Sequence, residues 1–144
     1  MTEATWDRIM AVNLKGVMFA CKHALPIMRA QGSGVITNIS SAAAVASVGL
    51  VAYKASKAAL NAYSQSLANG NAKYGIRANV IAPGLMGTPA MMAMPEDFRQ
   101  GLERLVQYPK RLGQPEVFAL LATQIVENPY LNGETIRLDG AIRM

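Results

Sequence analysis

The chain has 144 residues, of which 51% are hydrophobic and 16% are charged, so it holds enough apolar material for one globular core. Its formal net charge of +5 would suit an anionic partner, but the lysines and arginines are scattered without a dense run, which argues against nucleic-acid binding. No stretch approaches the ~18 apolar residues of a membrane span, and the single cysteine excludes an internal disulfide, so a soluble, cytoplasmic protein without a membrane partner is expected.

The first expected element is a helix from about Thr5 to Ala30. Apolar residues recur along it in steps of three and four, and the sequence QGSG at 31–34 ends the pattern. The run VITNIS at 35–40 follows, with β-branched residues between small ones, and predicts a buried strand. Ser40 and Ser41 therefore fall at the carboxyl end of that strand.

A second helix is expected from about Ala52 to Lys73, where the composition is rich in alanine. The sequence IRANVIAPG at 76–84 predicts a second strand that ends at Pro83 and Gly84. Residues 85–98 contain glycine, two prolines and four methionines, which indicates a loop with short helical pieces.

The last two expected elements are a helix at 115–127, which begins with proline, and a strand at 133–142. Alternation of helix and strand predicts an α/β fold with a Rossmann-like parallel sheet of about three strands and crossover helices. A complete doubly wound sheet of this type carries about six strands. The sequence therefore predicts only the second half of such a sheet.

Tyr53 and Lys57 stand four residues apart on the second expected helix, so their side chains share one face. A free tyrosine has a pKa of about 10, which is too high for efficient proton exchange near neutral pH. An ammonium ~4 Å away in an intermediate dielectric contributes about 4 kcal/mol, which corresponds to a fall of about two or three pKa units. The lysine therefore makes the phenol a candidate general acid and base.

Two further features fall at one edge of the expected sheet, where ligands of parallel sheets collect. A serine after the first strand could bond a substrate oxygen, and Pro83 with Gly84 after the second would let a flat ligand approach the backbone. Each feature alone is typical of an ordinary turn, and only their order indicates a site. No histidine, cysteine or carboxylate cluster has the spacing of metal ligands, so no metal site is expected.

The segments NISS at 38–41, YKASK at 53–57 and NVIAPG at 79–84 resemble the second half of the short-chain dehydrogenase/reductase family. The resemblance covers essentially the whole chain and implies a catalytic set of Asn13, a serine, Tyr53 and Lys57. Tyr53 would be the acid and base, and Lys57 would also bind the nicotinamide ribose.

The resemblance leaves two serines as candidates. The usual family spacing of twelve residues between serine and tyrosine selects Ser40, whereas the second serine of an NISS strand end selects Ser41. The segment between Ser41 and Tyr53 is one residue shorter than the family pattern, which would explain the conflict. We therefore prefer Ser41.

The implied cofactor is NAD or NADP, bound by Tyr53, Lys57, Pro83, Gly84 and Thr88. NAD is favoured because residues 111–144 resemble the short-chain 3-hydroxyacyl-CoA dehydrogenases, a group also known as a 17β-hydroxysteroid dehydrogenase. The Gly-rich phosphate-binding turn of the family is not in this sequence. Residues 1–144 are therefore expected to be the C-terminal part of a single NAD(P)-binding Rossmann-fold domain whose first half is absent.

Two functions are consistent with these features. The first is NAD(P)-dependent interconversion of a secondary alcohol and a ketone, a small-molecule substrate of 3-hydroxyacyl-CoA or hydroxysteroid type. The second is a catalytically inactive remnant or association module, because the first expected strand would expose an unpaired edge. The resemblance also implies a homo-oligomer, a tetramer in the family.

Overall fold

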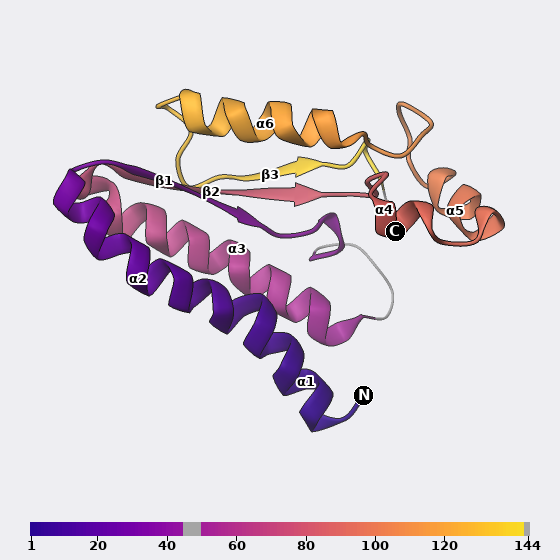
Figure 1. Ribbon diagram of the computed structural model, residues 1–144, viewed down its shortest axis with the longest axis horizontal. Coiled ribbons are helices and arrows are strands. Elements are labelled where there is room, and N and C mark those ends of the chain that lie inside the picture. The colour runs from indigo at the N-terminus through magenta and orange to yellow at the C-terminus, as the bar shows by residue number, and fades with distance from the viewer. Residues whose placement is uncertain (45–49, 143–144) are drawn as a thin grey trace.

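Three parallel strands form the sheet at the centre of the molecule, and helices cover both of its faces (Figure 1). The computed structural model describes residues 1–44 and 50–142. The strands lie in the order β1-β2-β3, with register pairs such as Ile39–Ile81 and Pro83–Leu138. The prediction of an α/β fold with about three parallel strands is confirmed. The strand bounds are β1 (Gly34–Ile39), β2 (Ile76–Pro83) and β3 (Thr135–Leu138).

The first predicted helix is a continuous helical rod with one irregular turn. It consists of α1 (Glu3–Met10), a π-helical turn (Ala11–Lys15) and α2 (Gly16–Gln31). Thr2 caps its start, because the Thr2 hydroxyl accepts a hydrogen bond from the N–H of Thr5 at 3.2 Å. Gly32, with φ of 70°, ends it. The π-helical turn was not predicted.

The rod and α3 (Val51–Asn71) lie on one face of the sheet, and α6 (Pro115–Glu127) lies on the other (Figure 1). The central strand β2 is therefore covered on both sides, which accounts for its mostly apolar sequence, IRANVIAP. A short 3₁₀ turn (Ala72–Tyr74) and Gly75, with φ of 70°, connect α3 to β2. The core is formed by β2 together with residues of the helices, including Cys21, Leu60, Leu67, Ala68 and Ile125.

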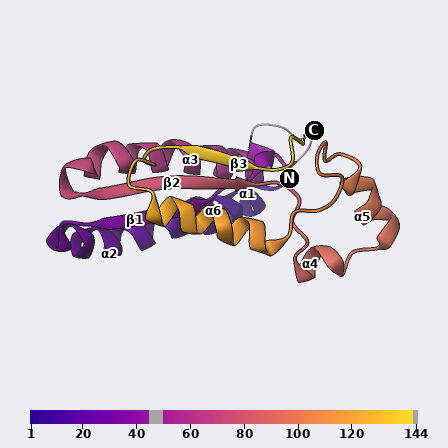
Figure 2. The ribbon, with the colours of Figure 1, turned by 90° about the horizontal axis from the view of Figure 1, so that it is seen from above.

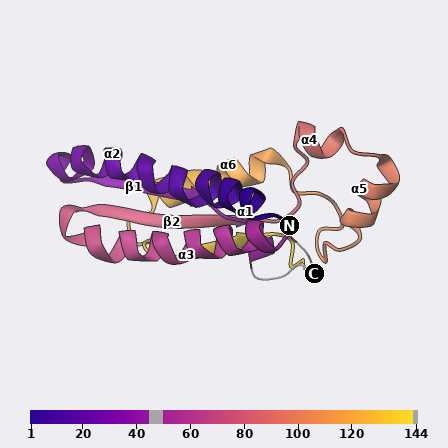
Figure 3. The same cartoon turned by 90° about the horizontal axis from the view of Figure 1, so that it is seen from below.

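Two short helices, α4 (Pro89–Met92) and α5 (Glu96–Glu103), project beyond the end of the sheet toward which the strands run (Figures 2 and 3). The sequence predicted a loop with short helical pieces at 85–98, and α5 continues past that range. The predicted last strand at 133–142 is too long. β3 ends at Leu138 because Gly140 and Ala141 both adopt positive φ, 58° and 60°, which an extended strand does not allow.

β1 is an edge strand, since in the part of the chain that the structure describes it pairs with β2 alone. Ile39 at its carboxyl end is 41% exposed. Within residues 1–44 and 50–142, no helix combines the length and apolarity needed to cross a membrane.

Candidate active site

The carboxyl ends of β1 and β2 lie at one edge of the sheet because the two strands run parallel. Ser40 and Ser41 follow β1, and Gly84 follows β2. The N–H of Ser40 donates to the carbonyl of Ile81 at 2.8 Å, which holds the start of the serine turn against β2. The two strand-end segments predicted to face one site are therefore neighbours.

Tyr53 and Lys57 lie one turn apart near the start of α3. Lys57 Nζ is 5.8 Å from the centre of the Tyr53 ring. The same ammonium donates a 2.7 Å hydrogen bond to the carbonyl of Ile39, the last residue of β1. Lys57 is half-buried, and this burial lowers the pKa of its ammonium because it penalises the charged form. The lysine thus connects the tyrosine's helix to the strand end that carries the serines.

The two candidate serines have different hydrogen-bonding environments. Ser40 is 3% exposed, and its hydroxyl donates to the backbone carbonyl of Lys57 at 3.1 Å. Ser41 is half-buried, and its hydroxyl accepts from the N–H of Ala43 at 3.1 Å. Among the described residues, the Ser41 hydroxyl acts only as an acceptor, which leaves its hydrogen available to a substrate oxygen. Ser41 therefore stays the preferred candidate. The length argument for Ser41 involves residues 45–49, which lie outside the described residues.

Asn13 sits in the π-helical turn of the N-terminal rod. Its side-chain amide donates to the hydroxyl of Ser56 at 3.1 Å, and Ser56 in turn donates to the carbonyl of Tyr53 at 2.7 Å. π-helical turns inside α-helices are frequent at functional sites. Asn13 is therefore joined through one residue to the helix turn that carries Tyr53. The sequence analysis missed Ser56, although its position three residues after Tyr53 places both on one helix face.

A cavity of about 450 Å³ opens at the end of β2. Thr88 caps α4, since its hydroxyl accepts from the N–H of Met91 at 3.3 Å. Gly84 is required by packing, because a Cβ there would lie 2.7 Å from the Cβ of Asp139. The cavity is mostly apolar, with a threonine hydroxyl at its wall, and is lined by Pro83, Gly84, Met86, Thr88, Met91, Pro115 and Phe118.

The predicted site residues do not all line this cavity. Tyr53 instead lines a separate hollow of about 320 Å³ with Met1, Ile9, Leu50, Val51 and Ala52. In the described residues, the contacts above connect Asn13 to the turn of α3 that carries Tyr53, and Lys57 to the end of β1 that precedes the serines. The cofactor candidates Pro83, Gly84 and Thr88 form a second group at the same edge of the sheet.

The cavity beyond β2 has an apolar wall suited to a flat aromatic ring, and the half-buried Lys57 at the neighbouring strand end offers donors suited to a ribose. Together these residues are candidates for the nicotinamide ribose half of a dinucleotide. These residues fit that half of the cofactor. The parallel sheet with helices on both faces and the residues gathered at its carboxyl edge define the chain as part of a Rossmann-like α/β fold.

Comparison with known proteins identifies the family. The family model described as "Enoyl-(Acyl carrier protein) reductase" matches residues 1–142. The chain belongs to the short-chain dehydrogenase/reductase family of oxidoreductases.

Curated relatives at the sequence level include several named 3-hydroxyacyl-CoA dehydrogenase type-2. The chain is 49% identical to the Mus musculus protein over 112 residues, which is 77% of this chain and 43% of the relative. It is 43% identical to the Homo sapiens protein over 146 aligned residues, or 96% of this chain and 56% of the relative. The Synechocystis acetoacetyl-CoA reductase is 36% identical, with 98% of this chain and 60% of the relative covered. The chain spans about half the length of these relatives.

A solved structure has the same fold. The crystal structure of 3-hydroxyacyl-CoA dehydrogenase type-2 from Mycobacterium avium superposes with a TM-score of 0.94 at 31% identity. The match covers 99% of this chain and 58% of that one. The three-stranded sheet is therefore a part of a larger Rossmann-like fold in this relative.

Proposed function

We propose that this chain supplies the catalytic half of an NAD(P)-dependent dehydrogenase that interconverts a 3-hydroxyacyl-CoA and a 3-ketoacyl-CoA. The observation that carries the proposal is the connection of Tyr53, Lys57 and the serine turn through Lys57 Nζ and the carbonyl of Ile39. The similarity to 3-hydroxyacyl-CoA dehydrogenase type-2 and to acetoacetyl-CoA reductase supports the substrate class. NAD is the favoured cofactor, and residues 1–144 are proposed to be the C-terminal part of one NAD(P)-binding domain.

When bound, the cofactor accepts or donates a hydride. The residues of this chain would handle the oxygen and the proton. In the reduction direction, Ser41 Oγ donates a hydrogen bond to the ketone oxygen, and Tyr53 gives that oxygen its proton. Lys57 supplies positive charge beside the phenol and holds the ribose, while Asn13 fixes the turn of α3 through Ser56. Pro83, Gly84 and Thr88 would hold the nicotinamide.

The direct test is reduction of acetoacetyl-CoA by the full-length protein, followed by NADH absorbance. Tyr53→Phe removes the proton donor while keeping the ring, so kcat should fall by about 10²- to 10⁴-fold. Tyr130→Phe is a matched control, because Tyr130 is 97% exposed, and it should leave kcat unchanged. Equal rates for wild type and Tyr53→Phe would refute the proposal.

A second function is favoured by one observation, the free outer edge of β1 in the described part of the chain. An unpaired edge is a template for pairing with another strand, so the chain would serve as an association module without catalysis. Titration of the purified 144-residue chain with NADH distinguishes the two. Saturable binding at micromolar concentration favours the dehydrogenase, and association of the chain without NADH binding favours the module.

We further propose that the protein is a homo-oligomer, a tetramer by analogy with the family, and that its helical face forms an interface. Val12, Met18 and Phe19 of the N-terminal rod are 67%, 38% and 43% exposed. A hollow of about 610 Å³ lies between the rod and α3, and Met10, Leu14, Ala59 and Tyr63 are among its lining residues. Phe19→Asp should shift light scattering of the full-length protein toward smaller species. Phe98→Asp, a control at a phenylalanine of α5 that is 56% exposed, should not.

A further inference from the structure

The chain after β3 folds into a tight hook at residues 139–142. Gly140 and Ala141 both have positive φ, 58° and 60°, and such a value is uncommon for alanine. Asp139 Oδ1 accepts the N–H of Ala141 at 3.1 Å, and the carbonyl of Asp139 accepts the N–H of Ile142 at 3.2 Å. Unfavourable backbone conformations persist only where the surroundings enforce them, and they cluster at functional sites. The hook is therefore held in place by specific contacts.

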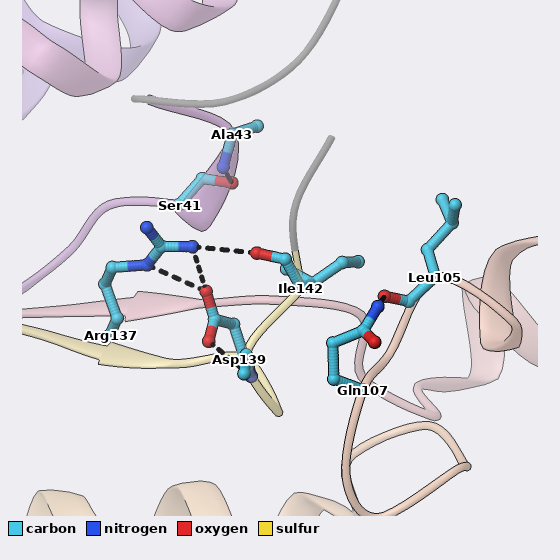
Figure 4. Close-up of polar contacts among 8 residues, drawn as sticks. Ser41, Ala43, Leu105, Gln107, Arg137, Asp139 and Ile142 are labelled. Atoms are coloured by element: carbon cyan, nitrogen blue, oxygen red, sulfur yellow. Dashed lines mark hydrogen bonds and ion pairs between the residues drawn. The ribbon is translucent and has the colours of Figure 1, made fainter.

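Arg137, the third residue of β3, closes the hook. Its guanidinium binds the Asp139 carboxylate through two nitrogens, with Nε at 2.8 Å, and donates to the carbonyl of Ile142 at 3.1 Å (Figure 4). The Asp139 side chain is only 7% exposed, so this ion pair is shielded from water on the carboxylate side. Both nitrogens bond the same oxygen, Oδ2, so Oδ1 remains free to accept the N–H of Ala141.

The hook and the Ser41 turn share one apolar cluster. Ile142 is fully buried and packs in one cluster with Ala42, Val106 and Leu85. Ala42 immediately follows Ser41 and is 1% exposed. The turn itself is closed by two bonds to Ser41, from the N–H of Ala43 to its hydroxyl and from the N–H of Ala44 to its carbonyl. Movement of Ile142 would therefore move the backbone that carries the Ser41 hydroxyl.

The hook also contacts the end of β2 and the segment after α5. A Cβ on Gly84 would lie 2.7 Å from Asp139, and the N–H of Gly84 donates to the carbonyl of Leu138 at 2.9 Å. The carbonyl of Gly140 accepts the N–H groups of Gln107 and Tyr108 at 2.9 and 3.2 Å. Figure 4 draws the Ser41 turn, the hook and Gln107 around Ile142.

We propose that Arg137 is a positioning residue, which fixes the Ser41 turn and the end of β2 at a set spacing by bonding Asp139 and the carbonyl of Ile142. The inference rests on the proposed function, because it assigns Ser41 to the substrate and Gly84 to the nicotinamide. Among the hydrogen bonds of the described residues, those of Arg137 go to Asp139 and Ile142 and not to Ser41 or Gly84. A small displacement caused at a distance can cost a factor of up to about 10² in rate.

The test compares Arg137→Met with Arg104→Met, an exposed arginine at the end of α5, in the full-length protein. Amide hydrogen exchange by NMR reads the positioning without any need for activity. In Arg137→Met, the amides of Ala43, Ala44, Gln107 and Tyr108 should exchange faster. The amide of Val80, which bonds the carbonyl of Glu134 within the sheet, should not change. Arg104→Met should leave all of them unchanged.

Kinetics provide the second readout. Arg137→Met should lower kcat for acetoacetyl-CoA reduction by roughly 10- to 100-fold while KM for the nucleotide stays near wild type, and Arg137→Lys should recover part of kcat. If Arg137→Met does not fold, Ile142→Val, which deletes one buried methyl group, should give the same pattern at smaller amplitude. Unchanged exchange at Ala43 and Ala44 in a folded variant would overturn the proposal. Faster exchange there in a protein whose wild type is inactive would support the positioning role and refute the proposed function.

Discussion

Separate alanine substitutions at the two serines after β1 should affect different properties of the protein. Ser41→Ala removes the hydroxyl that we assign to the substrate oxygen, and loss of one such donor lowers kcat by about 10²- to 10³-fold, or ~2.7–4 kcal/mol. The hydrogen bond from the N–H of Ala43 is also lost. Because this bond is half-buried and neutral, the free energy of unfolding should fall by only about 0.5–1.5 kcal/mol.

Ser40→Ala should lower the stability of the protein rather than its kcat. The Ser40 hydroxyl is buried and donates to the carbonyl of Lys57 at 3.1 Å, so the substitution leaves a poorly solvated acceptor. We expect the free energy of unfolding to fall by about 1–3 kcal/mol while kcat of the folded protein changes little. Steady-state kinetics at saturating NADH and urea denaturation, each on the full-length protein, measure the two quantities. A large loss of kcat in Ser40→Ala together with near-normal kcat in Ser41→Ala would refute the assignment.

Three further substitutions test the packing and electrostatics of the site. Gly84→Ala should destabilise the protein by about 1–3 kcal/mol in urea denaturation, because the new Cβ would lie 2.7 Å from the Cβ of Asp139. Unchanged stability would show that the two turns separate easily. Tyr63 has its pKa raised to about 12, mainly by burial, so the folded state holds a proton that the unfolded state releases between pH 10 and pH 12. Stability should therefore fall as pH rises through that window, and Tyr63→Phe should reduce the slope of the unfolding free energy against pH. An identical slope in the variant would contradict the raised pKa of Tyr63. Burial lowers the pKa of Lys57, so between that lowered pKa and the usual 10.5 the unfolded state binds the proton more readily than the folded state. The free energy of unfolding should therefore rise with pH over that range, and Lys57→Met should abolish the rise.

The sequence predicted the regular elements well because their signals are local. The apolar periodicity of the N-terminal helix and the alanine-rich composition of α3 each act over many residues, and Gly32 and Gly75 end their helices with positive φ. The helix at 115–127 has the bounds that were predicted, since Pro115 fixes its start. These features need no knowledge of the rest of the fold.

The elements that the sequence analysis missed depend on tertiary contacts. The predicted strand at 133–142 overlooked the turn signal Asp139-Gly140, and β3 ends at Leu138 just before it. That Ile142 then joins Ala42 in one buried cluster is a tertiary contact that the sequence does not show. The π-helical turn around Asn13 accompanies a hydrogen bond to Ser56, which lies 43 residues later. The helix α5 is different, because Glu96 and Asp97 in its first turn are a local helix-start signal, and the predicted segment with short helical pieces stopped too early at residue 98.

In the candidate site, too, local sequence signals could be predicted and tertiary contacts could not. Order and spacing of NISS, YKASK and NVIAPG predict a serine after β1 and a Tyr53–Lys57 pair on the next helix, and the structure has both elements where they were expected. The bond from Lys57 to the carbonyl of Ile39 could not be predicted from that spacing, because it depends on how α3 crosses β1. The role of Arg137 also lay outside prediction: its spacing from Asp139 is visible in the sequence, but the contact of Ile142 with Ala42 is not.

Solvent isotope and rate measurements on Tyr53→Phe test the central claim most directly, since the phenol is the group that we assign to proton transfer. With acetoacetyl-CoA and NADH, the full-length wild type should reduce the ketone, and Tyr53→Phe should retain nucleotide binding while kcat falls by about 10²- to 10⁴-fold. Tyr130→Phe should match wild type throughout. A Tyr53→Phe protein that reduces acetoacetyl-CoA at the wild-type rate, with the same solvent isotope effect, would contradict the account.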